Sequence, residues 1–175
     1  LLKHLVQGDR WDLVFNIAEG MYGFGRESLV PALLEAYQIP YTFSDPLTLS
    51  LCLHKAMAKH VVRDLGIQTA RFGVLDSLEE GPIEGLSDLG FPLFVKPVAE
   101  GTSKGVTEAS LVTRPERLKS AVAELLRRYK QPVLVEEYLP GREFTVGVLG
   151  SGAQAQVLGA LEVKTRGAGE KASYS

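Results

Sequence analysis

A lysine near the end of an apolar strand is the first residue that could take part in chemistry. Lys96 follows Leu93 and Val95 in the run of residues 92–97. An unpaired ammonium group costs free energy when it is buried, so Lys96 must reach a sheet edge or face a negative group. A phosphate would satisfy it. A salt-bridged or snorkelling lysine is the structural alternative, and Lys96 taken alone fits that alternative better.

The segment that follows this strand has the composition of a phosphate-binding loop. Residues 100–105 read Glu-Gly-Thr-Ser-Lys-Gly. Glycines let backbone N–H groups approach an anion, and Thr102 and Ser103 add hydroxyl donors. The chain has no GxxxxGKS/T motif, and the same loop could be a hairpin tip, so this signal is weak by itself.

A third group of candidate residues lies where an apolar strand ends in acids. Glu136 and Glu137 close the run that begins at Val133, and Glu143 follows after a turn. The backbone at such a strand end can pair with a purine edge, and a carboxylate a few residues later can bind two ribose hydroxyls. Surface acids at a strand end are the alternative, which is common for one glutamate and less common for this ordered set.

The second half of the chain must supply the sheet that positions these residues. Short apolar runs predict strands at residues 71–75, 92–97, 132–137, 143–149 and 155–161. The last two are predicted to form a hairpin because Gly150, Ser151 and Gly152 join them. The second half is therefore predicted to be an antiparallel sheet with a helix packed on it.

The clearest helix in the sequence lies between these strands. Residues 118–129 place apolar side chains at helical spacing, and Thr113 and Glu116 predict a capping box ahead of them. Residues 77–88 carry turn signals, and residues 164–175 are predicted to be a mobile tail.

The first half has the pattern of a βαβ unit. Residues 11–16 predict a buried strand, residues 27–37 a helix with Pro31 in its first turn, and residues 39–42 a second strand. After that unit, residues 45–65 predict one helix or two in succession.

Signals at both ends define that helical stretch. Asp45 and Pro46 suit the N-cap and the first helical position, and Gly66 suits the end of the helix. The boundary between the two halves is predicted within this stretch, near residues 52–55.

The bulk composition limits the classes of function. Nineteen Lys+Arg against 21 Asp+Glu give a net charge of -2, so there is no electrostatic case for nucleic acid or an anionic membrane as partner. With no signal peptide and no membrane-spanning run evident, the sequence predicts a soluble cytoplasmic protein. The single cysteine, Cys52, is predicted to be a buried free thiol.

Two of these segments together resemble D-alanine–D-alanine ligases of the ATP-grasp superfamily. They are residues 91–105 and 135–146, whose order and spacing are fairly specific, and the likeness also covers Val-Phe-Asn-Ile-Ala-Glu-Gly at residues 14–20. The resemblance implies an α/β (α+β) class and an ATP-grasp fold. Residues 1–54 would be the end of a Rossmann-like domain, residues 55–144 the small antiparallel ATP-binding subdomain, and residues 145–175 the start of the larger one.

The resemblance also implies a binding site for ATP. Two lysines would hold the phosphates, a flexible glycine-rich loop would close over them, a strand end would pair with adenine, and an acid would bind ribose. The residues at these positions are Lys55, Lys96, Gly101, Thr102, Ser103, Gly105, Glu136, Glu137, Tyr138, Leu139 and Glu143. Tyr174 matches the start of a second active-site loop of the family.

The reaction implied by the resemblance joins a carboxylate to an amine. ATP would phosphorylate the carboxylate, and the amine would attack the resulting acylphosphate. ATP and Mg²⁺ are the implied cofactors, a small amino-acid-like molecule is the implied substrate, and a homodimer is a compatible assembly. A non-catalytic ATP-binding module and an ATP-grasp carboxylase are the alternatives.

The chain also departs from the family pattern. The first strand of the family and the acids that hold magnesium would lie outside residues 1–175, so we expect a piece of a longer protein, inactive alone, with no metal ligands or catalytic side chain of its own. Glu19 stands where the ligases usually carry histidine, which makes it a candidate substrate-binding residue and argues against D-alanine. Thr102 replaces the more usual serine.

Overall fold

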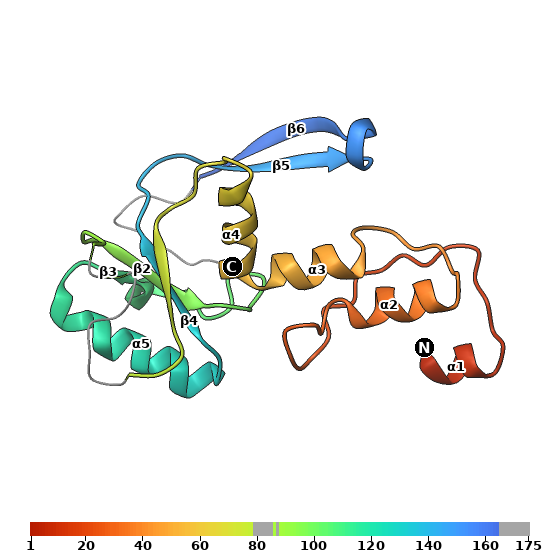
Figure 1. The fold of residues 1–175 in the computed structure, drawn as a ribbon, viewed down its shortest axis with the longest axis horizontal. Helices are drawn as coiled ribbons and strands as arrows, with labels where there is room; N and C mark the ends of the chain where they lie inside the picture. Colours follow the sequence, from red (N-terminus) through yellow and green to blue (C-terminus); the bar gives the residue numbers. More distant parts are fainter. Residues whose placement is uncertain (79–85, 87, 165–175) are drawn as a thin grey trace.

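A computed structural model describes residues 1–78, 86 and 88–164 of the chain (Figure 1). The helices are α1 (Leu2–Val6), α2 (Leu29–Ala36), α3 (Pro46–Leu53), α4 (Lys55–Asp64) and α5 (Pro115–Tyr129), with single 3-10 turns at Glu108–Ser110 and Gly152–Gln154. The strands are β1 (Phe72–Leu75), β2 (Leu93–Pro97), β3 (Leu111–Val112), β4 (Val133–Glu137), β5 (Glu143–Leu149) and β6 (Gln156–Val163).

The larger sheet holds three of the predicted candidate residues, Lys96, Glu136 and Glu137. Its order is β1-β4-β2-β3, and all its neighbouring strands are antiparallel. The predicted antiparallel sheet with a packed helix is therefore confirmed for these strands. β5 and β6 form the predicted antiparallel hairpin, but among the described residues they make a separate two-stranded sheet, so their place in the helix-covered sheet is wrong.

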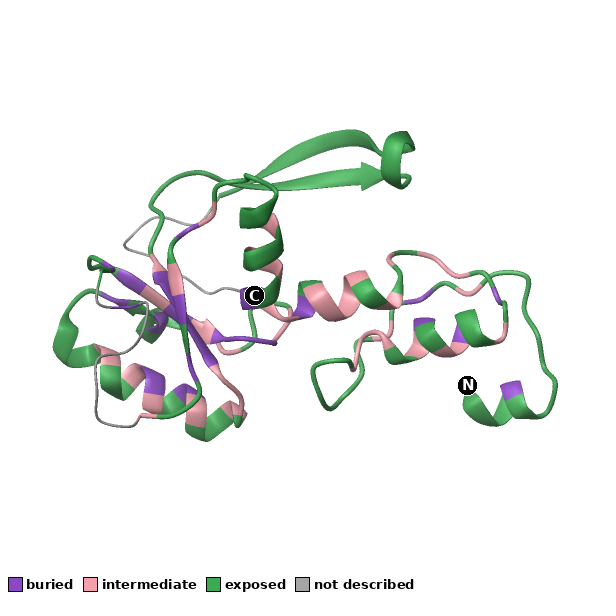
Figure 2. Cartoon of the chain, viewed as in Figure 1, coloured by how far each residue is buried: buried purple, intermediate pink, exposed green. Residues whose placement is uncertain are grey.

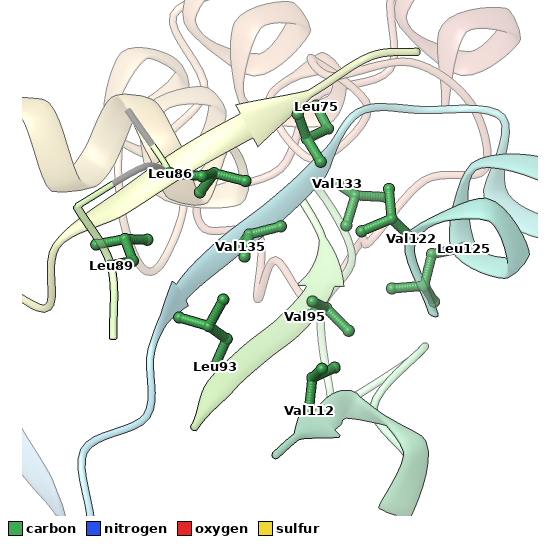
Figure 3. Packing of buried hydrophobic residues seen from close by; sticks show 10 residues of the cluster. All are labelled: Leu75, Leu86, Leu89, Leu93, Val95, Val112, Val122, Leu125, Val133 and Val135. Atoms are coloured by element: carbon green, nitrogen blue, oxygen red, sulfur yellow. The ribbon is translucent and has the colours of Figure 1, made fainter. Parts of the chain in front are cut away.

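Side-chain alternation gives this sheet two different faces. On the face toward α5, residues of β2 and β4 join side chains of the helix in one buried cluster (Figure 3). Its members are Leu75, Leu86, Leu89, Leu93, Val95, Val112, Val122, Leu125, Val133 and Val135. Because successive strand residues point to opposite faces, Lys96, Leu134 and Glu136 must point to the other face.

That other face carries a second, smaller core beside α4. Leu134 packs there with Leu53, Ala56, Val98 and Ala99. This cluster attaches the start of α4 to the sheet, and the backbone N–H of Lys55 donates to the carbonyl of Val98 at 2.9 Å. The first turn of α4 is thereby fixed next to the end of β2.

The helical stretch after Asp45 consists of two helices in succession, which is one of the two predicted arrangements. The Asp45 carboxylate caps α3 by accepting from the backbone N–H of Thr48 at 3.0 Å, and these contacts with Thr48 lower the pKa of Asp45. His54 separates α3 from α4. Gly66 follows α4 with a φ of 77°, which suits a helix end. The expected boundary at residues 54 and 55 coincides with this break and stays a prediction.

The prediction for Cys52 is wrong, because its side chain is exposed. Helix α3 has apolar residues on every side, and only one of its faces meets the core. Leu53 occupies that face and is buried, so its neighbour Cys52 is turned away.

The capping box predicted ahead of α5 is also wrong. Pro115 takes the first helical position, and the residue before a proline is held in an extended conformation. Arg114 is therefore the N-cap residue, with φ -138° and ψ 139°, and no side chain caps this helix.

The N-terminal part keeps the chain order of a βαβ unit, but its two predicted strands, residues 11–16 and 39–42, are reduced to one bridge between them. Val14 pairs in parallel with Tyr41 on either side of α2, and Pro31 lies in the first turn of that helix as predicted. The predicted strand at residues 11–16 is otherwise wrong, because Phe15 is 68% exposed. Among the described residues, the Tyr41 segment is the only partner available to it.

The hairpin of β5 and β6 extends away from both cores (Figures 1 and 2). All of its residues are exposed, and its turn includes Gly150 at a φ of 87°. Most of the predicted turn region at 77–88 and the predicted tail with Tyr174 lie outside the described residues. Within the part that the structure describes, no helix is long and apolar enough to cross a membrane.

We predict that Leu93→Ala lowers the free energy of unfolding by about 2–5 kcal/mol, because it opens a cavity in the α5-side core. Leu93 is 1% exposed. Leu158→Ala in β6, which is 68% exposed, is the matched control and should change it by less than about 0.5 kcal/mol. Urea unfolding of both variants measures the difference, and equal losses would contradict the packing of this sheet.

Candidate functional site

A cleft of about 1340 Å³ runs along the α4 face of the sheet. It is lined by the first turns of α4, the end of β2, the loop after β2, the end of β4 and the start of β5. It brings together most of the predicted ATP-binding residues, namely Lys55, Lys96, Gly101, Thr102, Ser103, Glu136, Glu137, Tyr138, Leu139 and Glu143. Gly105 and Glu19 are not among its lining residues.

A carboxylate shared by two lysines lies at the centre of this cleft. Glu136 accepts from Lys59 at 2.8 Å and also forms an ion pair with Lys96. Burial alone would raise the pKa of Glu136, but the charges of Lys96 and Lys59 and their hydrogen bonds hold it below its usual value. The carboxylate is therefore charged and keeps both ammonium groups on the cleft side of the sheet.

Lys55 lies beside Glu136, Lys59 and Lys96. Among the described residues, no carboxylate pairs with its ammonium group. Its Nζ donates to the backbone carbonyl of Glu100. Burial lowers its pKa to about 8, and the positive charges of Lys96 and Arg26 act in the same direction. This arrangement leaves a partly buried cation that an incoming anion would stabilise.

The loop after β2 makes a tight turn with unusual backbone angles. Thr102 and Ser103 both have positive φ, at 48° and 57°, and the backbone N–H of Lys104 donates to the carbonyl of Gly101 at 2.9 Å. Thr102 is β-branched, for which this conformation is rare and strained. The turn places residues 101–104 at the rim of the cleft.

Gly105 shapes this loop although it does not line the cleft. Its φ is 86°, and a Cβ atom at this position would lie 2.5 Å from Cγ of Pro97. Only glycine fits both the angle and the space. The predicted contact of Gly105 with ATP thus stays a prediction, and the structure gives the residue a steric reason of its own.

At the strand end that is expected to pair with adenine, the side chains and the backbone make different contacts. Glu137 pairs with Arg71, which lowers the pKa of Glu137. The backbone N–H groups of Glu137 and Tyr138 donate to the carbonyls of Arg71 and Pro92. The next N–H along the chain, that of Leu139, is the candidate donor to a purine, beside the stacked rings of Phe94 and Tyr138.

Sequence reasoning missed several cleft residues. Lys59 is the clearest, and its position could have been found, because Lys55 and Lys59 are four residues apart on one helix and must share a face. The sequence indicates Glu100 only as the first residue of the loop and gives it no role in the cleft. Its carboxylate accepts from Gln131 at 2.8 Å and pairs with Arg26 and Lys104 at 3.8 Å and 3.3 Å. Gln131 and Arg26 are far from Glu100 in sequence, so no local signal connects them, whereas Lys104 is only four residues away.

Glu19 lies outside the set of residues that line the cleft. Glu19 is exposed and follows Asn16, whose Oδ1 accepts from the N–H of Ala18 at 3.2 Å and turns the chain there. In the described part of the chain, no group of three or more His, Cys, Asp or Glu side chains could hold a metal ion.

Comparisons with known proteins agree with this geometry. Residues 61–170 match the family model described as "D-ala D-ala ligase C-terminus". An uncharacterized protein of Sinorhizobium fredii is 40% identical over 86% of this chain, and a D-alanine–D-alanine ligase of Xylella fastidiosa is 39% identical over 80% of it. The solved D-alanine–D-alanine ligase of Coxiella burnetii has a TM-score of 0.72 at 29% identity and covers 90% of this chain and 47% of that one.

The chain spans 42% and 45% of the length of the two curated relatives. The family model, however, matches more than half of this chain, and the structural likeness confirms the expected ATP-grasp fold and α+β class. The chain therefore belongs to the D-alanine–D-alanine ligase family of ATP-grasp proteins.

Proposed function

We propose that the cleft binds ATP and that the protein is an ATP-dependent carboxylate–amine ligase. One observation carries the proposal. Lys55 at the start of α4, Lys96 in β2 and the loop of residues 101–104 line the same cleft as the strand end at Tyr138 and Leu139. The relatives named as ligases support the reaction class.

The proposed reaction needs charge stabilisation more than a nucleophilic side chain. An oxygen of the substrate carboxylate attacks the terminal phosphorus of ATP, the bond to ADP breaks, and an acylphosphate forms. The amine then attacks the acyl carbon, inorganic phosphate leaves, and the amine loses a proton. Lys55 and Lys96 would neutralise the charge that develops on the transferred phosphoryl group and on ADP.

In this proposal Glu136 positions Lys96 and does not contact adenine through its side chain. Its carboxylate is occupied by Lys59 and Lys96. The backbone after β4 would pair with the purine, and Glu143, which lines the cleft at the start of β5, would bind the ribose hydroxyls. Magnesium and a homodimer stay proposals from the resemblance, and a cytoplasmic location stays a proposal from the sequence.

We predict that Lys96→Ala in the full-length protein weakens ATP binding by about 10- to 150-fold, since a hydrogen bond to a charged group contributes roughly 1.5–3 kcal/mol. Calorimetric titration with ATP measures it. Lys119→Ala, an exposed position on α5, is the control and should bind as wild type does. Unchanged affinity in Lys96→Ala would remove Lys96 from the phosphate site.

We predict that ATP binding takes up a proton at Lys55 and weakens as the pH rises above about 8. In the empty cleft the pKa of Lys55 is lowered to about 8. A polyphosphate favours the charged amine and raises this pKa. Below pH 8 the amine is already charged and affinity is flat; above it, affinity falls up to about tenfold per pH unit.

Titrations between pH 7.5 and 9.5, in buffers of different ionisation enthalpy, measure this proton uptake. Lys55→Arg is the matched variant, because a guanidinium group stays charged over this range. Its affinity should not show the decline. The same decline in Lys55→Arg would show that another group is responsible.

We predict that the full-length enzyme is a poor D-alanine dimerising ligase and joins a different amine-bearing substrate. Glu19 follows the segment around Val14 at the end where open α/β sheets place ligands. A carboxylate there favours an ammonium group and repels a carboxylate, in contrast to the usual histidine. ADP formation with D-alanine alone, compared with a set of other amino acids, decides it. Strong, saturable activity with D-alanine as sole substrate would rule the idea out.

A further inference from the structure

Lys104 is a cleft-lining cation that none of the assigned roles uses. Its backbone closes the turn over Thr102 and Ser103, and its side chain lines the same cleft as Lys55 and Lys96. The side chain is 66% exposed and forms an ion pair with the carboxylate of Glu100 at 3.3 Å. The ammonium group is therefore solvated and free to change partner at little cost.

The carboxylate of Glu100 has other partners besides Lys104. Its carboxylate is only 12% exposed and accepts from Gln131 at 2.8 Å. Gln131 is fixed in turn, because its Oε1 accepts from the backbone N–H of Ala99 at 2.8 Å. The guanidinium group of Arg26, also 12% exposed, lies 3.8 Å from the same carboxylate. If Lys104 leaves, Glu100 keeps a buried cation and a hydrogen-bond donor.

We propose that Lys104 is a third phosphate-binding cation of this cleft, which rests on Glu100 when the cleft is empty and moves to the polyphosphate when nucleotide binds. This inference rests on the proposed function and adds a residue to it. It makes the loop of residues 101–104 a charged contact, in addition to the backbone and hydroxyl donors expected of it.

The balance of charges favours this exchange of partners. Glu100 offers Lys104 a single negative charge that Arg26 already shares, whereas a polyphosphate offers several. Glu136 occupies Lys59 and Lys96 on the floor of the cleft. Lys104 sits at the rim on a four-carbon stem, so its ammonium group can reach the bound anion without movement of the sheet.

Lys104→Gln tests the proposal in the full-length protein by calorimetric titration with ATP and with adenosine. We expect about tenfold weaker ATP binding, the lower end of what one hydrogen bond to a charged group contributes. Adenosine, which has no phosphate, should bind as it does to the wild-type protein. Lys104→Arg should keep most of the ATP affinity, and Lys119→Gln on α5 should keep all of it.

Three results of these titrations would overturn the proposed role of Lys104. Unchanged ATP affinity in Lys104→Gln, with Lys96→Ala still defective, would overturn this proposal and leave the ATP site standing. Equal losses for ATP and adenosine would show a structural effect and would also overturn it. Absence of ATP binding in the wild-type protein would overturn both the site and this extension.

A double-mutant cycle tests the resting partner. Glu100→Gln keeps an acceptor oxygen for Gln131 but removes the charge that competes with phosphate for Lys104. ATP affinity should therefore rise several-fold in Glu100→Gln and rise less when Lys104 is already glutamine. Equal rises in both backgrounds would show that Lys104 does not exchange between these two partners.

Discussion

The shared ion pair of Glu136 with Lys59 and Lys96 is the interaction on which the cleft depends. Three charged side chains from α4, β2 and β4 meet on the face of the sheet opposite α5. Without the carboxylate, two ammonium groups would repel each other in a partly dehydrated site. Without the lysines, a buried carboxylate would be uncompensated. The group therefore holds α4 against the sheet and keeps a surplus of positive charge for a ligand.

Much of the candidate site could be predicted because it lies on strands and on their immediate extensions. Lys96 and Glu136 stand in alternating runs, where strand periodicity assigns each residue to a face. The strand pairing that places Lys96 opposite Leu134 was not predictable residue by residue, because it depends on register. Lys59 was overlooked, although helical spacing from Lys55 would have indicated it.

The failed predictions share a physical cause, because a local sequence pattern does not show which residues will be neighbours in the folded structure. The run around Phe15 has the composition of a buried strand, but the described residues give it one bridge at Val14 and no covering layer. Cys52 has apolar neighbours in sequence, yet helix geometry turns it away from the face that Leu53 buries. Thr113 and Glu116 have the spacing of a capping box, and Pro115 shifts the start of the helix past it.

The close packing of Gly105 on Pro97 anchors one end of the loop of residues 101–104. Pro97 ends β2 and is fully buried, so one end of the loop is fixed to the rigid sheet. The partly buried carboxylate of Glu100, which accepts from Gln131, holds the other end. Between these two contacts, Thr102, Ser103 and Lys104 are exposed. The loop is therefore a short strap held at both ends, whose exposed middle can redirect its side chains toward a ligand.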